Sequence, residues 1–197
     1  MVHALKCDIK KFFDSIDQTV LIRLIQARVQ DEDALLLIRQ IIGSFSKSWG
    51  IGLPLGNVTS QLLANIYLNQ LDQFVKHQIR AKYYLRYCDD FIILGHHPDT
   101  LKETAKQIDS FLQERLKLYL HPNKIIIRKY RQGIDFLGYV VLPNHRVLRT
   151  KTKHRLLKKV SEKSLVSYLG VLSHCDGHII REKILEKCRI DSLKKIE

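Results

Sequence analysis

Two short β-rich runs, residues 83–87 and 91–94, are separated by only three residues, Cys88-Asp89-Asp90. This spacing predicts a tight hairpin and therefore an antiparallel pair of strands. Further apolar runs typical of strands cover residues 4–9, 125–130 and 134–141. Helical spacing of apolar residues lies between them, over residues 16–29, 34–42, 60–79 and 99–118. Because hairpins and helices mix without strict βαβ alternation, the sequence predicts the α+β class.

The character of the chain changes near Pro143-Asn144. Everything after Asn144 reads as helical, and residues 146–163 carry a dense run of Lys and Arg. We therefore expect one domain over residues 1–144 and a basic helical domain over residues 145–197.

The chain has 33 Lys and Arg against 20 Asp and Glu, a formal net charge of +13. Such a surplus suits a polyanionic partner, because clustered cations gain free energy by releasing phosphate counterions.

Cysteine and histidine spacing argues against a zinc site or a disulfide framework. The four cysteines form no CxxC pair, and no HExxH motif occurs. No run approaches the roughly 20 apolar residues of a membrane-spanning helix. The first residues also lack the apolar run of a signal peptide. We expect a cytoplasmic protein without membrane contact.

Three carboxylates are the strongest candidates for chemistry. Asp89 and Asp90 are adjacent at the predicted hairpin tip, and Asp8 ends the strand predicted over residues 4–9. Adjacent carboxylates repel each other, and Mg²⁺ removes this difficulty because it prefers hard oxygen ligands. Two such ions about 3.5–4 Å apart promote in-line phosphoryl displacement. Asp pairs in turns also occur for local reasons, and spacing alone does not bring Asp8 to the hairpin.

Five blocks resemble, in the same order, the catalytic blocks of bacterial reverse transcriptases. They are Cys7-Asp8-Ile9-Lys10-Lys11-Phe12-Phe13 with Asp14-Ser15-Ile16, Gly52 to Gln61, Tyr87-Cys88-Asp89-Asp90, Leu120 to Lys124, and Phe136-Leu137-Gly138-Tyr139. The resemblance covers roughly residues 4–141. It implies a right-hand polymerase palm over residues 1–144, a small antiparallel sheet backed by helices, with a remnant of the fingers–palm connection around residues 34–58. A helical thumb over residues 145–197 would follow.

The resemblance also implies roles for individual residues. The metal ligands would be Asp8, Asp89, Asp90 and the backbone carbonyl of Ile9, and Lys124 would complete the catalytic set as a proton donor to pyrophosphate. The nucleotide contacts would be Phe12, Phe13, Leu55, Gly56 and Gln61, with Phe13 as the steric gate against a ribose 2′-hydroxyl. The nucleic-acid contacts would be Tyr87, Gly138, Arg149, Lys151, Lys153, Arg155 and Lys158. The alternatives are core packing for one phenylalanine and a solvated side chain for Lys124.

The implied activity is RNA-directed DNA synthesis, in which dNTPs are added to a primer 3′-hydroxyl with two Mg²⁺ ions, or Mn²⁺ in their place. An RNA template and a DNA or RNA primer would be the partners, with an accessory protein and self-association as further expectations. Leu55-Gly56 and Ser60-Gln61 resemble the enzymes of diversity-generating retroelements; group II intron and retron enzymes are the next choice. Because Asp8 lies close to Met1, we expect the upstream fingers to be missing and activity of this chain alone to be weak.

Two alternatives from other classes stay open. One is a catalytically idle nucleic-acid-binding module that keeps the palm fold. The other is a different palm nucleotidyltransferase, such as an RNA-templated RNA polymerase or a nucleotide cyclase. Phe13 argues against the RNA polymerase, and the ordered blocks argue against the cyclase. Only an assay separates an active polymerase from an idle module.

Overall fold

The computed structural model describes residues 1–193 and divides the chain into two compact units. The first comprises Met1–Arg128 and the second begins at Lys129. The domain boundary predicted after residue 144 lies inside the second unit.

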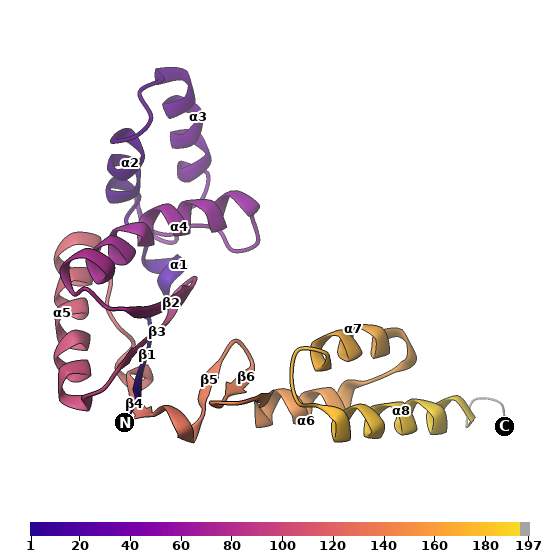
Figure 1. Cartoon of the computed structure of the whole chain (residues 1–197). Helices are drawn as coiled ribbons and strands as arrows, with labels where there is room; N and C mark the ends of the chain where they lie inside the picture. The colour runs from indigo at the N-terminus through magenta and orange to yellow at the C-terminus, as the bar shows by residue number, and fades with distance from the viewer. Residues whose placement is uncertain (194–197) are drawn as a thin grey trace. The chain divides into compact units, whose positions relative to one another are not determined.

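The first unit is built on a four-stranded sheet in the order β2-β3-β1-β4 (Figure 1). Its strands are β1 (His3–Asp8), β2 (Tyr83–Tyr87), β3 (Asp90–Gly95) and β4 (Ile126–Lys129). Strand β3 pairs antiparallel with β1 on one side and with β2 on the other. Only Cys88 and Asp89 separate β2 from β3, so the predicted hairpin is confirmed.

Helices accompany this sheet, with α5 alongside it, and the mixture confirms the predicted α+β class (Figure 1). They are α1 (Phe12–Ser15), α2 (Gln18–Gln26), α3 (Glu32–Gly43), α4 (Val58–Gln73), the π-helical turn η1 (Phe74–Gln78), α5 (Pro98–Leu116) and the 3-10 turn η2 (Pro122–Lys124). Helix α5 packs on β1 and β3, and α4 packs on α5 and α2. Carboxylates cap two of these helices: Asp17 accepts from the Val20 amide and Asp31 from the Ala34 amide.

The two faces of the sheet differ because side chains alternate along each strand. Leu5 and Cys7 of β1 point into the core that the helices share. Lys6 and Asp8 alternate with them and belong to the opposite face. On the edge strand β2, Leu85 and Tyr87 remain more than half exposed. The alternation therefore sends the carboxylate of Asp8 away from the apolar core.

The loop between α3 and α4 is held by one buried amide. The Gln18 side chain is 8% exposed, and its Nε2 lies 3.1, 2.7 and 2.9 Å from the carbonyl oxygens of Ile42, Phe45 and Gly52. These three carbonyls belong to the end of α3 and to the loop that follows it. The side-chain amide of Gln18 thereby supplies these carbonyls with the hydrogen-bond donors that backbone N–H groups supply in a helix or sheet.

We expect Gln18→Leu to lower the free energy of unfolding by about 2–4 kcal/mol, because it leaves buried carbonyl groups without a donor. Urea denaturation followed by circular dichroism measures the change. Gln26→Leu, at an exposed position of the same helix, is the matched control and should change stability by no more than about 0.5 kcal/mol. Equal effects of the two substitutions would contradict the bracing role of Gln18.

The second unit contains a three-stranded sheet in the order β5-β6-β7 and three helices. Its elements are the 3-10 turn η3 (Tyr130–Gln132), β5 (Ile134–Phe136), β6 (Tyr139–Val141), β7 (Arg146–Leu148), α6 (Thr150–Lys159), α7 (Glu162–Leu172) and α8 (His178–Leu193). Their own apolar cluster includes Leu148, Leu156 and Leu172. Within residues 1–193, no helix is long and apolar enough to cross a membrane.

Two sequence predictions in this unit are wrong. Residues 134–141 form a hairpin rather than one strand, because Leu137 and Gly138 both adopt positive φ, at 51° and 87°, and reverse the chain. Residues 146–148 form the strand β7 rather than helix. Arg146, expected on a helical basic stripe, therefore lies on a strand that pairs with β6.

Candidate active site

The backbone of the first unit brings three aspartates to one edge of the sheet. Asp8 ends β1 directly opposite Asp90, the first residue of β3. Asp89 occupies the turn before β3, and its carbonyl accepts a 3.2 Å hydrogen bond from the amide of Ile9. The predicted meeting of Asp8 with the hairpin tip is therefore a direct result of strand pairing. No long side chain has to bridge a gap.

Two lysines contact these carboxylates. Lys124 Nζ lies 2.8 Å from both carboxylate oxygens of Asp8, and Lys6 Nζ lies 3.4 Å from Asp90 Oδ2. Lys6 precedes Asp8 by two residues on β1, so both point to the same face. The hydrogen bond with Asp8 raises the pKa of Lys124 and keeps its ammonium group charged.

Burial shapes the protonation of the hairpin carboxyls. It raises the pKa of Asp89, and the nearby charges of Asp8 and Asp90 raise it further. Burial likewise raises the pKa of Asp90, and the ammonium group of Lys6 only partly offsets that effect. Both shifts mean that the folded chain disfavours the doubly ionised hairpin. A cation at this edge would relieve the repulsion.

The donor set at this edge suits a hard divalent cation. The Oδ1 atom of Asp90 is buried and has no hydrogen-bond partner among the described residues. A buried oxygen without a partner costs free energy, and a metal ion is one means of satisfying it. Within residues 1–193, however, no group of three or more His, Cys, Asp or Glu residues is arranged to hold a metal ion. In the described arrangement, lysine ammonium groups engage Asp8 and Asp90.

A second network holds the hairpin from the core side. Arg86 of β2 donates from Nε and Nη2 to the two carboxylate oxygens of Asp72 on α4, at 2.8 and 2.6 Å. Tyr84 also donates to Asp72, at 2.7 Å. Arg86 Nη1 lies 3.0 Å from the carbonyl oxygen of Cys88, a residue with the left-handed φ of 51°. The guanidinium thus links α4 to the turn that carries Asp89, and it fixes a backbone conformation that non-glycine residues rarely adopt.

The remaining predicted residues of the first unit have different surroundings. Phe12 is 2% exposed in the core, and Phe13 is partly exposed, with ring centroids 5.3 Å apart. The structure therefore leaves Phe13, rather than Phe12, as a candidate nucleotide contact. The predicted contacts around the start of α4 are exposed to solvent; they are Leu55, Gly56 and Gln61. Tyr87 is 59% exposed at the end of β2, beside the aspartates.

The second unit carries the predicted nucleic-acid contacts that follow residue 128. Gly138 lies in the turn between β5 and β6, and Arg149 precedes α6. The basic residues predicted on α6 are all exposed: Lys151, Lys153, Arg155 and Lys158. Three of them lie at positions i, i+4 and i+7 and so share one helix face.

Sequence reasoning missed Lys6, Asp72 and Arg86. Alternation along β1 was a usable signal for Lys6, because it lies two residues from Asp8. For Arg86 the signal was an arginine on the buried side of a predicted strand, which requires a partner. Nothing in the sequence identified Asp72 on α4 as that partner.

Known proteins resemble this chain in sequence and in fold. The profile of the family described as "Reverse transcriptase (RNA-dependent DNA polymerase)" matches residues 2–141. The group II intron-encoded protein LtrA of Lactococcus lactis subsp. cremoris is 26% identical over 249 residues, covering 91% of this chain and 40% of LtrA. YkfC of Escherichia coli (strain K12) is 24% identical over 198 residues, covering 78% of this chain and 49% of YkfC.

Solved structures add a likeness of fold alone. Telomerase from Candida albicans, in complex with a fragment of telomeric RNA, superposes with a TM-score of 0.65 at 14% identity, over 99% of this chain and 40% of that one. A foamy viral protease-reverse transcriptase in complex with an RNA/DNA hybrid gives a TM-score of 0.51 at 18% identity, over 86% and 21% of the two chains. The present chain spans less than half the length of these proteins.

Proposed function

The chain belongs to the reverse transcriptase (RNA-dependent DNA polymerase) family, and from that membership we propose that it supplies the catalytic palm of an RNA-directed DNA polymerase. The observation that carries the proposal is the pairing of Asp8 with Asp90 beside the Asp89 turn. Three carboxylates at one sheet edge, with Lys124 in contact with Asp8, form a charge arrangement suited to nucleotidyl transfer. We retain the palm over residues 1–144 and the thumb over residues 145–197 as part of the proposal.

Each residue has a defined task in this mechanism. Asp8, Asp89 and Asp90, with the Ile9 carbonyl, would hold Mg²⁺, which supplies activation of the primer 3′-hydroxyl and stabilisation of the leaving pyrophosphate. Lys124 would donate a proton to that leaving group, and its raised pKa means that the ammonium group is protonated at neutral pH. Phe13 would exclude a ribose 2′-hydroxyl by filling the space it needs. Exposed basic residues of α6 would track phosphates without reading sequence.

Primer extension on an RNA template, with Mg²⁺ and dNTPs, tests the proposal. We expect the chain to extend the primer weakly and Asp90→Asn to abolish that extension. Asp99→Asn changes an exposed carboxylate elsewhere and is the matched control. Tight binding of primer-template without any Asp90-dependent extension would favour the idle nucleic-acid-binding module instead.

We further propose that the enzyme derives from a retroelement of the diversity-generating type. Leu55-Gly56 and Ser60-Gln61 support this assignment, whereas the sequence relatives include group II intron-encoded proteins. Leu55 is 74% exposed and would line the incoming base pair, where an apolar side chain offers no hydrogen bond. Loose selection of the incoming base is the consequence we infer.

We expect Leu55→Gln to lower the frequency of misincorporation severalfold, because the amide restores a polar contact near the new base pair. Sequencing of extension products from an RNA template gives the error frequency for each template base. Leu62→Gln alters an exposed leucine of α4 outside the predicted contacts and serves as the control. An unchanged error frequency in Leu55→Gln would refute this role.

A further inference from the structure

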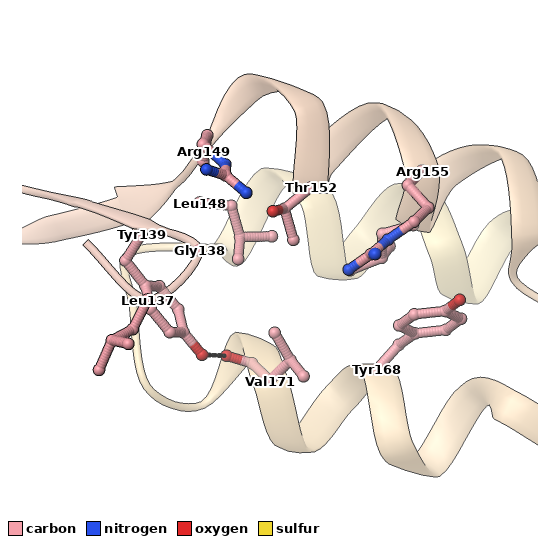
Figure 2. A pocket seen from close by; sticks show the side chains of 10 residues that line it. Leu137, Gly138, Tyr139, Leu148, Arg149, Thr152, Arg155, Tyr168 and Val171 are labelled. Atoms are coloured by element: carbon pink, nitrogen blue, oxygen red, sulfur yellow. Dashed lines mark hydrogen bonds between the residues drawn. The ribbon is translucent and has the colours of Figure 1, made fainter. Parts of the chain in front are cut away.

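The second unit contains a pocket lined in part by three predicted nucleic-acid contacts, Gly138, Arg149 and Arg155, and its apolar side has no role in the function proposed above. Its volume is about 240 Å³, and it lies between the β5–β6 turn and the helices α6 and α7 (Figure 2). The residues that matter for its chemistry are Leu148, Arg149, Thr152, Arg155, Leu156 and Tyr168. All of them belong to the second unit, so the pocket is complete within it.

Hydrogen bonds fix the walls of this pocket. The Tyr139 hydroxyl donates to the Val171 carbonyl at 3.0 Å and ties α7 to β6, as the dashed line in Figure 2 shows. The Arg149 amide donates to the Gly138 carbonyl at 3.0 Å and ties the start of α6 to the β5–β6 turn. The cavity is therefore framed by elements that are linked to one another. A ligand would meet a formed site rather than have to create one.

One part of the pocket is cationic. Arg149 and Arg155 both line it, and Figure 2 shows Arg155 extending from α6 into the space between α6 and α7. The Nε atom of Arg149 is buried and has no hydrogen-bond partner among the described residues. Its Nη1 atom lies 3.4 Å from both carboxylate oxygens of Asp135, which orients the guanidinium through long contacts. The Arg149 side chain as a whole is 43% exposed and lines the pocket, so its guanidinium can meet an anionic group of a ligand.

The rest of the pocket is apolar and aromatic. Leu148 and Leu156 are at most 5% exposed and form an apolar surface, and the partly exposed Tyr168 adds an aromatic ring from α7. A bare phosphate would gain nothing from such surfaces. A planar base attached to a phosphate matches both halves, because bases stack on aromatic rings and phosphates bind guanidinium groups.

We propose that this pocket receives one unstacked nucleotide of a single-stranded polynucleotide, with its base against Tyr168 and its phosphate at Arg149. The inference rests on the proposed function, since it assumes that the second unit binds the template or primer. It goes further by assigning a site that recognises a base rather than backbone charge alone. Tyr168 is then a stacking residue, and Arg155 closes over the same base as a cation.

Fluorescence anisotropy with two probes tests the assignment on the full chain. One probe is a short deoxyadenosine oligonucleotide, and the other is an abasic oligonucleotide with the same number of phosphates. We expect tighter binding of the first, and we expect Tyr168→Leu to reduce that preference on the order of ten-fold. Tyr168→Phe keeps the ring and should retain the preference. Arg149→Gln should weaken binding of both probes.

The outcomes separate the base-binding role of the pocket from the proposed function of the chain. Equal weakening of both probes by Tyr168→Leu, or a preference unchanged in that variant, would overturn the assignment of a base to the pocket. If Tyr168→Leu is unfolded by thermal melting, equal affinity of the wild-type chain for the two probes still overturns it. A wild-type chain that extends primers but shows no base preference refutes the base-binding role of the pocket and leaves the proposed function standing. A wild-type chain that binds neither probe refutes the proposed function as well.

Discussion

Asp89→Asn should abolish primer extension while leaving the fold at least as stable as that of the wild-type chain. Loss of one metal-binding oxygen is expected to slow nucleotidyl transfer by about 100-fold or more. The opposite effect on stability follows from electrostatics. Burial and the charges of Asp8 and Asp90 raise the pKa of Asp89, so its ionised form is less favourable in the folded chain than in the unfolded chain. At neutral pH a neutral amide removes that penalty.

The two effects are measured separately, by extension rate and by urea denaturation at pH 7. Asp33→Asn, at an exposed position of α3, is the matched control and should change neither quantity appreciably. A marked loss of stability in Asp89→Asn would show that the carboxylate serves the fold of the hairpin. Full extension activity in the same variant would remove Asp89 from the catalytic set.

Arg86→Met should lower the free energy of unfolding by about 2–4 kcal/mol, after allowance for the partial exposure of Asp72. The substitution keeps the apolar stem of the side chain but leaves the Asp72 carboxylate without its bidentate partner. It also frees the Cys88 carbonyl, so the turn that presents Asp89 loses a support. We therefore expect extension by the folded variant to slow through kcat, with KM for dNTP little changed.

Two variants make this test specific. Arg86→Lys restores the charge but not the planar fork, so it should recover only part of the stability and of kcat. Lys102→Met disrupts the exposed pair with Asp99, which solvent screens, and should leave stability nearly unchanged. A loss in Arg86→Met no larger than that in Lys102→Met would contradict the bracing role. Urea denaturation and steady-state extension kinetics provide the measurements.

Local patterns predicted much of the first unit. A short apolar run predicted β1, and the three residues between the two β-rich runs predicted the hairpin of β2 and β3. The apolar pattern predicted one strand through the β5–β6 turn because Leu137 adopts positive φ, a conformation that its side chain disfavours and that sequence patterns rarely reveal. Strand β7 was missed because its three residues lie beside a basic helix and are too few to show alternation.

Local sequence patterns could not predict the side-chain contacts between residues far apart in the chain. Lys124 reaches Asp8 across 116 positions of the chain, and Asp72 meets Arg86 only because α4 packs near β2. Both contacts depend on how the elements pack, which spacing does not encode. The resemblance to a family placed Lys124 near the leaving phosphate, whereas its contact with Asp8 came from the structure.

Lysine side chains of the chain itself act as counterions to the aspartates at the sheet edge. Lys124 and Lys6 partly offset the mutual repulsion of carboxylates that strand pairing forces together, so folding of the first unit would not require a bound cation. Folding of this unit and binding of the proposed metal ions would then be independent events. A newly made chain could thus reach its folded state before it ever meets a nucleotide.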